Sequence, residues 1–372
     1  MKILVLANLD SYVVLLRKEL LMRLIAEGHS VHVVSSMERC PQALLDMGCE
    51  ITHVPFDGRG TNPVKDWKLL RRYQTLLKEL RPDVVLTYTV KANAYGGWAC
   101  RRAKTPYLVN VTGLGDAMEH PGLLQKIVLT LTRFGLKRSN CVFFQNASNQ
   151  KAFLQHGVIG EKVRNRLLPG SGVNLQEHCY EAYPDEKRGL RFLFVGRMIR
   201  DKGVEELFGA IEKLLESGQQ AYFRFVGDCD PVYRDRLDRL CATGHVEYLG
   251  YRNGLHEIVA DSHCVILPSY HEGTSNALLE AAATGRPVIA TNVPGCRETF
   301  DDGISGLGCE AKSTDSLYTQ ILRFLSLSHE NREAMGKAGR RKMEKEFDRQ
   351  IVVDAYLEEI NRIFSEKEGL KR

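Results

Sequence analysis

The sequence has no apolar run near the roughly 18 residues that a transmembrane helix requires, and no basic segment precedes its apolar opening, MKILVLA. Its ten cysteines are scattered and contain no CxxC pair, which argues against a disulfide framework and against a structural zinc site of the usual spacing. Without an export signal, we expect the protein to reside in a reducing cytoplasm.

Several signatures of common enzyme classes are also missing. The chain contains no GxSxG elbow, no P-loop, no long Rossmann fingerprint and no HExxH, and its eleven histidines show no ligand spacing. One DxD triplet occurs at residues 228–230, but it follows the apolar run FRFVG and precedes Pro231. That context favours a turn and helix cap over a metal site, so we expect neither a metal nor a resident cofactor.

What is present is a globular chain of 372 residues, 44% hydrophobic and 26% charged, long enough for two domains. Its charge is divided unevenly. Through residue 175 there are 24 Lys and Arg against 13 Asp and Glu, a net charge of +11, and the remainder carries −6. Anionic lipid, a phosphorylated acceptor or nucleic acid would each suit the basic half.

Short runs rich in β-branched and aromatic residues alternate with helical patterns, which predicts parallel, doubly wound sheets. Six such runs precede the polar, proline-broken segment 178–189, and five follow it; they are MKILVLA, HSVHVVSS, EITHVPF, PDVVLTYT, TPYLVNVTG and CVFFQN, then GLRFLFVGR, QAYFRFVGD, GHVEYLG, HCVILPSY and RPVIATNV. We therefore expect one Rossmann-like domain over 1–172 and another over 173–350. The amphipathic C-terminal helix, 351–372, would pack back on the first.

The segment 271–295 carries the sharpest pattern, HEGTSNALLEAAATGRPVIATNVPG. A predicted strand ends at Tyr270, a polar loop follows, and a helix begins near Ser275. Gly273 would let backbone N–H groups approach a ligand, and the helix N-terminus would favour an anion. Glu280, inside that helix, could accept hydrogen bonds from a pair of ribose hydroxyls. A glutamate near a helix start can also simply compensate the dipole, and this alternative stays open.

A second loop, in VGRMIRDKGVEELFGA at residues 195–210, places Arg197 and Lys202 after a predicted strand. A guanidinium and an ammonium five residues apart suit a diphosphate. An ordinary solvated loop is the alternative.

Taken in this order, the motifs identify a resemblance. With VGR…DKG, VGD at 226–228, YLGY at 248–251 and EGTSNALLE, the chain resembles the retaining glycosyltransferases of family 4. This resemblance implies the GT-B fold, two Rossmann-like domains facing a cleft. The segments 91–115, 143–150 and 167–174 are similar to a bacterial subgroup. Its members add an N-acetylhexosamine or galactose to polyprenyl-diphosphate-linked glycans of O-antigen, capsule or N-glycan precursors.

The resemblance also implies roles for single residues. Glu272, Arg197 and Lys202 would be catalytic, with the two cations on the diphosphate of a UDP-sugar and Glu272 on the sugar hydroxyls. Glu280 would bind the donor ribose. The remaining donor contacts would come from Gly196, Gly273, Thr274, Ser275, Asn276, Tyr251 and Arg252.

Two departures from the family concern the first domain. Many relatives have a Gly-Gly turn where this chain has ANLDSYVV, and many have a histidine where Val90 stands. Without that imidazole we expect front-face attack, with the leaving phosphate taking the acceptor proton. The expected acceptor or cleft residues are Asn8, Lys91, Asn93, Thr112, Gly113 and Gly115. The GxG of this set could equally form an ordinary tight turn.

The stretch LLQKIVLTLTRFGLKR, residues 123–138, combines basic residues with apolar ones at helical spacing, and no acid occurs from 120 to 160. It suits a helix on an anionic membrane surface, or a core helix with a solvated basic edge. Given the resemblance, we expect the protein to be peripheral on the cytoplasmic face of the inner membrane. The basic residues are Lys126, Arg133, Lys137 and Arg138.

Two other functions remain as alternatives. A UDP-sugar epimerase of the same fold would use the donor site without an acceptor. A nucleic-acid-binding protein could use the basic half, but that half lacks a recognisable module with interleaved aromatics, and the acidic half would repel a polyanion. We therefore expect no nucleic-acid partner.

Overall fold

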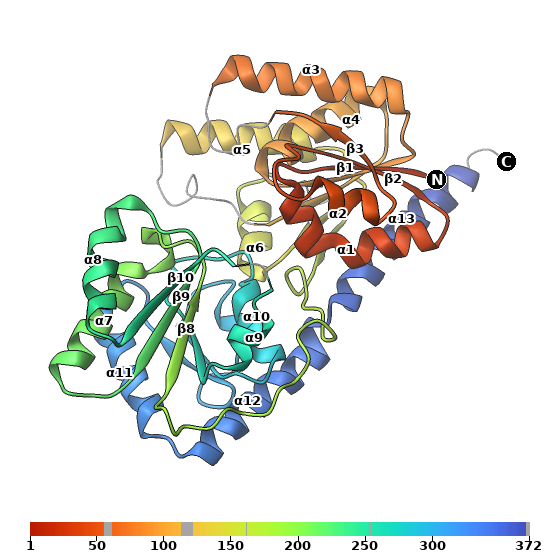
Figure 1. Ribbon diagram of the computed structural model, residues 1–372. Helices are drawn as coiled ribbons and strands as arrows, with labels where there is room; N and C mark the ends of the chain where they lie inside the picture. The colour runs from red at the N-terminus through yellow and green to blue at the C-terminus, as the bar shows by residue number, and fades with distance from the viewer. Residues whose placement is uncertain (56–61, 113–121, 161, 253, 370–372) are drawn as a thin grey trace. The chain divides into compact units, whose positions relative to one another are not determined.

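The computed structural model describes residues 1–55, 62–112, 122–160, 162–252 and 254–369. Its chain divides into two compact units, which are here called unit 1 (Met1–Ser171 with Gln350–Arg372) and unit 2 (Gly172–Arg349). These limits differ by one residue from the domain limits expected from the sequence. Figure 1 follows the chain through both units by colour.

Unit 1 is built on a seven-stranded parallel sheet with the order β3-β2-β1-β4-β5-β6-β7. The order reverses between β1 and β4, and open α/β sheets bind ligands beyond the carboxyl ends of the strands at such a point. All six strands predicted for this part form, and a seventh, β7, was not predicted. The strands are β1 (Lys2–Leu6), β2 (Ser30–Ser35), β3 (Glu50–His53), β4 (Val84–Tyr88), β5 (Tyr107–Val111), β6 (Cys141–Phe144) and β7 (Asn165–Leu167).

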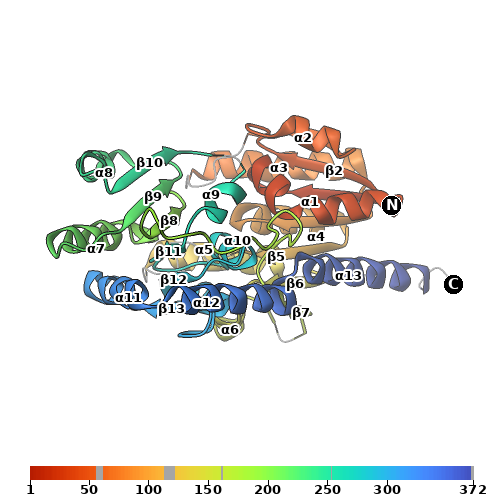
Figure 2. The ribbon, with the colours of Figure 1, turned by 60° about the horizontal axis from the view of Figure 1, so that its bottom comes forward.

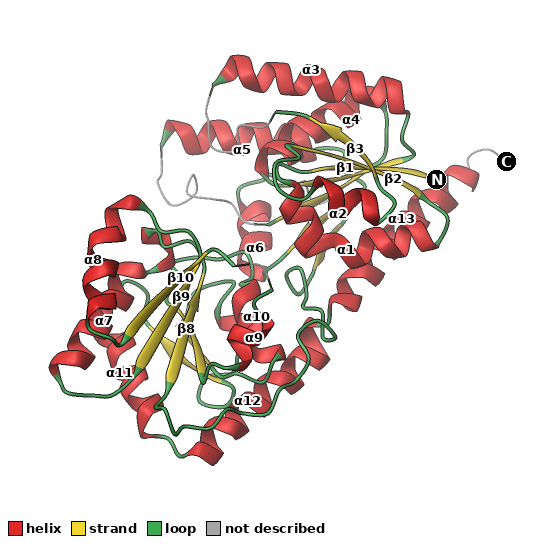
Figure 3. Ribbon diagram, in the orientation of Figure 1, coloured by secondary structure: helices red, strands yellow, loops and turns green. Residues whose placement is uncertain are grey.

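Helices cover both faces of this sheet, as Figure 3 shows. Alternate residues of β1 face opposite sides: Ile3 and Val5 pack into one apolar cluster with helices α1 and α13, while Leu4 and Leu6 join another with α3 and α4. Figures 1 and 2 show α13 beside this sheet, which its buried Tyr356 contacts. The helices are α1 (Asp10–Ala26), α2 (Pro41–Asp46), α3 (Pro63–Leu80), η1 (Ala92–Gly96), α4 (Gly97–Ala103), α5 (Leu123–Leu136), α6 (Ala147–Gln155) and α13 (Arg349–Gly369).

Unit 2 repeats this architecture with six parallel strands in the order β10-β9-β8-β11-β12-β13. Its reversal lies between β8 and β11. The five predicted strands form, and β13 was not predicted. The strands are β8 (Arg191–Val195), β9 (Tyr222–Val226), β10 (Val246–Gly250), β11 (Cys264–Leu267), β12 (Val288–Thr291) and β13 (Gly306–Cys309).

The helices of unit 2 bury one large apolar cluster against this sheet. They are η3 (Arg200–Lys202), α7 (Val204–Glu216), α8 (Pro231–Ala242), α9 (His256–Ala260), α10 (Asn276–Ala283), η4 (Arg297–Thr299), α11 (Thr314–Ser326), α12 (His329–Lys342) and η5 (Met343–Phe347). Among the helices of the described residues, none combines the length and hydropathy that crossing a bilayer requires.

Candidate active site

Three glycines mark the carboxyl ends of neighbouring strands in unit 2. The N–H of Gly196 after β8 donates to Val226 O (2.9 Å), and the N–H of Gly227 after β9 donates to Gly250 O (3.0 Å). Gly227 has a φ of +131°, and a Cβ there would lie 2.1 Å from Gly196 O. A side chain is therefore excluded at Gly227, because the loops that follow β8 and β9 pack closely against each other at this end of the sheet.

The loop after β8 carries the two predicted phosphate-binding cations. Arg197 is exposed directly after Gly196, and Lys202 is the last residue of η3. The loop then turns at Gly203, whose φ is +68° and whose position leaves no room for a Cβ beside Pro268 O, 2.1 Å away. Gly203 therefore lets the Lys202 loop lie against the end of β11, where the second predicted motif begins.

Lys202 and Glu272 form an ion pair between Nζ and Oε1. Ser269 Oγ donates a second hydrogen bond to the same carboxylate oxygen (2.8 Å), and both charged side chains are largely buried, 23% and 14% exposed. The backbone of Glu272 is packed against Gly295, where a Cβ would lie 2.4 Å from Glu272 O. The structure thus brings together two residues 70 positions apart for which the family resemblance implies separate roles.

The helix predicted to begin near Ser275 is present and begins at Asn276. Ser275 is the N-cap of α10: its Oγ accepts from Leu278 N (3.4 Å), and its own N–H donates to Gly295 O (2.9 Å). Thr274 is buried beside Gly273, to whose carbonyl it donates. Asn276 opens the helix, and within the described chain its buried Oδ1 has no hydrogen-bond partner. The first N–H groups of an α-helix have no intrahelical partner, and here the cap satisfies that of Leu278. The start of α10 and the Asn276 oxygen could therefore meet a polar ligand.

Glu280 lies one turn further along α10. Burial raises the pKa of its carboxyl to about 7; Arg349 opposes this rise and Glu177 adds to it. Its Oε1 is 4.0 Å from His178 Nε2. At neutral pH this carboxyl is therefore divided between its protonated and ionised forms, and hydroxyl donors that bind the ionised form would lower its pKa.

The remaining predicted donor residues sit at the same edge of the sheet but are solvent-exposed. Tyr251 and Arg252 follow β10, and the side chain of Arg252 donates only to Tyr251 O (3.3 Å) among the bonds described. The DxD triplet is a turn and a helix cap, as predicted. Met198 N donates to Asp228 O, Asp230 N donates to Met198 O, and the Asp230 side chain caps α8 by accepting from Val232 N (3.1 Å).

In unit 1, the predicted acceptor residues are in different situations. Asn8 lies between β1 and α1, and its carbonyl accepts from Ser36 N (3.3 Å). Lys91 Nζ is paired with Asp66 Oδ1 of α3 (2.7 Å), a largely buried contact that sequence reasoning did not foresee. Thr112 directly follows β5. Gly113 and Gly115 lie outside the described residues.

Asn93 belongs to a polar cluster at the carboxyl ends of β4 and β5. Its Nδ2 donates to Asn110 O (2.8 Å), and its buried Oδ1 has no partner in the part of the chain described. The same holds for both side-chain polar atoms of Asn110 and for Oγ1 of Thr89, a non-glycine residue at φ +74°. Such strain is typical of functional positions. Sequence analysis missed Thr89 and Asn110, although a polar residue near the end of a buried strand (YLVNV) was a usable signal.

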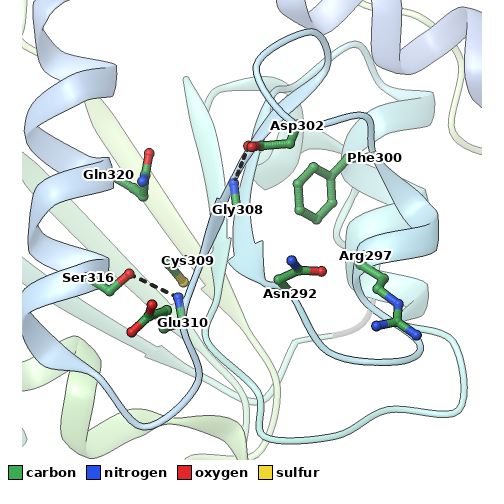
Figure 4. A pocket seen from close by; sticks show the side chains of 9 residues that line it. All are labelled: Asn292, Arg297, Phe300, Asp302, Gly308, Cys309, Glu310, Ser316 and Gln320. Carbon is green, nitrogen blue, oxygen red and sulfur yellow. Dashed lines mark hydrogen bonds between the residues drawn. The ribbon is translucent and has the colours of Figure 1, made fainter.

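A pocket of about 320 Å³ also opens beside β12 and β13 of unit 2, shown in Figure 4. Its walls are Asn292, Arg297, Phe300, Asp302, Gly308, Cys309, Glu310, Ser316 and Gln320. None of the predicted site residues lines it. The groups expected to handle a diphosphate lie instead on the η3 loop and at the start of α10.

Comparison with known proteins concerns the family of the two units. A family model described as "Glycosyl transferases group 1" matches residues 189–327, and one described as "Glycosyl transferase 4-like domain" matches residues 17–169. Together they cover most of both units. The three strand-end glycines, the η3 loop and α10 all lie within the residues matched by the first model. Asn93 and Asn110 lie within the residues matched by the second model.

Two curated bacterial enzymes are similar over most of the chain. The N,N'-diacetylbacillosaminyl-diphospho-undecaprenol alpha-1,3-N-acetylgalactosaminyltransferase of Campylobacter jejuni is 25% identical, covering 90% of this chain and 91% of its own. The UDP-Gal:alpha-D-GlcNAc-diphosphoundecaprenol alpha-1,3-galactosyltransferase of Escherichia coli is 25% identical, over 75% and 76%. Among solved structures, Anabaena HepE in complex with UDP and glucose has a TM-score of 0.77 at 17% identity, over 97% and 99%. This likeness shows that the fold is GT-B.

Proposed function

The chain belongs to the group 1 glycosyltransferases, and on that premise we propose that it moves a sugar from a UDP-sugar to a polyprenyl-diphosphate-linked saccharide, with retention of configuration. The product would be an intermediate of surface polysaccharide biosynthesis. Support for this acceptor comes from the Campylobacter and Escherichia relatives, both named for diphospho-undecaprenol acceptors. Their names also favour N-acetylgalactosamine or galactose as the transferred sugar, with N-acetylglucosamine as a third candidate.

The observation that carries the proposal is the arrangement around α10. A lysine–glutamate pair, Lys202 with Glu272, stands just before the helix start, and Glu280 lies within the helix. In our proposal the diphosphate meets Lys202, Arg197 and the N-terminal end of α10, Glu272 holds the sugar hydroxyls, and Glu280 holds the ribose. Anabaena HepE was solved with UDP, which supports UDP as the nucleotide.

We propose that the acceptor attacks from the face that the leaving group occupies. The bond between the anomeric carbon and the phosphate oxygen breaks, the bond to the acceptor oxygen forms on the same face, and the acceptor proton passes to the leaving phosphate. Lys202 and Arg197 neutralise the charge that grows on that phosphate. With these cations and the helix N–H groups, the diphosphate needs no divalent metal. Val90 offers no imidazole for an alternative proton transfer.

The acceptor lipid places the reaction at a membrane surface, and α5 is our candidate for the contact. Its exposed residues alternate cationic and apolar along one side of the helix, and Ile127 and Phe134 are 47% and 46% exposed. Exposed apolar side chains among cations suit a helix lying at an anionic headgroup layer. The cations are Lys126 and Arg133 of α5, with Lys137 and Arg138 directly after its last residue.

A donor panel tests the proposal. Purified protein is incubated with UDP-GalNAc, UDP-GlcNAc, UDP-Gal or UDP-Glc and a short-chain polyprenyl-diphosphate glycan, and the lipid product is identified by mass. We expect transfer from one donor in preference to the others. Conversion of the donor into its epimer without transfer would instead favour an epimerase, and the absence of transfer from all four donors would contradict the proposal.

A further inference from the structure

Three side chains of unit 2 outside the donor site bring together a thiol, a carboxylate and an imidazole. Cys179 and Glu181 come from the segment that follows the unit boundary, and His256 is the first residue of α9. Cys179 Sγ lies 3.4 Å from Glu181 Oε1 and 3.5 Å from His256 Nε2, and the last two atoms are 3.3 Å apart. Within the described residues this is the one cluster of its kind.

These three distances match the separations between ligand atoms around a tetrahedral zinc ion. Zinc binds thiolate sulfur at about 2.3 Å and imidazole nitrogen or carboxylate oxygen at about 2.0–2.2 Å, so tetrahedral angles separate the ligand atoms by about 3.3–3.6 Å. A metal could therefore bind just above the centre of the triangle with little movement of the side chains. We propose that Cys179, Glu181 and His256 bind Zn²⁺, with water as the fourth ligand.

The backbone that carries the first two ligands is held in place independently. Glu181 N donates to Thr284 O (3.2 Å), and Arg286 Nη1 donates to Glu181 O (3.0 Å). On the other side of Cys179, Arg340 Nη1 donates to the carbonyl of His178 (2.9 Å). These bonds fix the ligand segment on the end of α10, so the metal would meet a site that is already ordered.

The ligand chemistry also favours zinc over harder cations. A thiolate with an imidazole and one carboxylate selects zinc, whereas Mg²⁺ and Ca²⁺ require oxygen ligands. Without metal, the thiol of Cys179 donates to Glu181. On binding, that proton leaves to solvent, the sulfur bonds to zinc as thiolate, and His256 binds through Nε2, so affinity should fall as the pH is lowered.

The position of the site suggests what the metal does. The ring of His178 packs edge-on against that of His256, with 6.0 Å between centroids, and His178 faces Glu280. Zinc would hold this segment beside Glu280 and take no part in the chemistry at the anomeric carbon. This role is structural. His256 lies 75 positions after Glu181 in the sequence, so a search for short ligand spacings finds only Cys179 and Glu181.

The test is metal binding by the full chain without a histidine tag, using Co²⁺ as a spectroscopic probe and Zn²⁺ to displace it. We expect one Co²⁺ per chain with a thiolate-to-cobalt absorption band that Zn²⁺ abolishes. Cys179→Ser should remove the band, and His256→Ala should weaken Zn²⁺ binding by more than the roughly 10–100-fold that loss of an outer-shell partner costs. Cys241→Ser, in α8, is the matched control and should bind like the wild type.

Absence of stoichiometric binding, or an unchanged band in Cys179→Ser, would overturn the proposal. Glu181→Gln gives a milder ligand change should either substitution unfold the protein, which circular dichroism would reveal. The assay involves no sugar transfer, so absence of metal binding would leave the proposed glycosyltransferase function untouched. Likewise, absence of sugar transfer would leave the proposed zinc site untouched.

Discussion

Replacing Lys202 by alanine should cost the enzyme most of its activity while leaving its fold intact. Two unit charges about 4 Å apart interact by about 4 kcal/mol at the effective dielectric constant of about 20 that suits partly buried groups. The 23% exposure of Lys202 places it in that class. Removing one oriented charge at a leaving group typically lowers kcat by roughly two to three orders of magnitude. We expect a loss of this size in Lys202→Ala.

The ion pair with Glu272 makes a second explanation possible, in which Lys202 merely positions that carboxylate. UDP affinity, measured by calorimetry, separates the two. If Lys202 acts on the diphosphate, Lys202→Ala weakens binding of UDP itself, whereas Glu272→Gln impairs sugar transfer and leaves UDP affinity near that of the wild type. Lys213→Ala is the matched control, because Lys213 also pairs with a carboxylate in unit 2, that of Asp315.

A folded Lys202→Ala enzyme that transfers sugar within a few-fold of the wild-type rate would refute a role for Lys202 at the leaving diphosphate. Unchanged UDP affinity together with reduced transfer would assign Lys202 a positioning role instead. Lys213→Ala should match the wild type in both measurements.

Three further outcomes follow from the same structure. Arg197→Ala should lower kcat by a similar factor, measured in the same transfer assay with thermal unfolding as a check of the fold. In the proposed role of Glu280 its carboxylate form accepts from the ribose, so the donor KM should fall as the pH rises through about 7, and Glu280→Gln should flatten this dependence. The raised pKa of Glu280 also means that the free energy of unfolding decreases as the pH rises toward that value. Binding to anionic vesicles should exceed binding to neutral ones and should weaken with salt. Reversal of four cations to glutamate should abolish this binding, whereas reversal of Arg239 and Arg323 of unit 2 should not. The four cations are Lys126, Arg133, Lys137 and Arg138.

The sheets could be predicted because buried parallel strands carry continuous apolar runs that stand out from the amphipathic helices between them. The two strands that escaped prediction lack that signal. β7 is the three-residue segment NRL, and β13 is GLGC, half glycine, and each pairs at a sheet edge with one neighbour. Their pairing depends on the neighbouring strands of the sheet, so the residues of β7 and β13 alone do not predict it.

The local structure of the candidate site could be predicted where it lies in one segment, as in the loop from Glu272 to the cap at Ser275. Contacts between segments that are distant in the sequence could not be predicted. The pairing of Lys202 with Glu272 depends on Gly203 lying against the end of β11, and that of Lys91 with Asp66 depends on α3 covering the sheet. The triad of Cys179, Glu181 and His256 is a contact of the same kind.

The most direct test of the central claim is the anomeric configuration of the product, made from the preferred UDP-sugar in excess EDTA and read from its NMR coupling constant. We expect transfer without added metal and a product with the configuration of the donor. Inversion at the anomeric carbon would contradict retention by front-face attack. Loss of activity that Mn²⁺ or Mg²⁺ restores, and Zn²⁺ does not, would contradict a diphosphate held by Arg197, Lys202 and the start of α10.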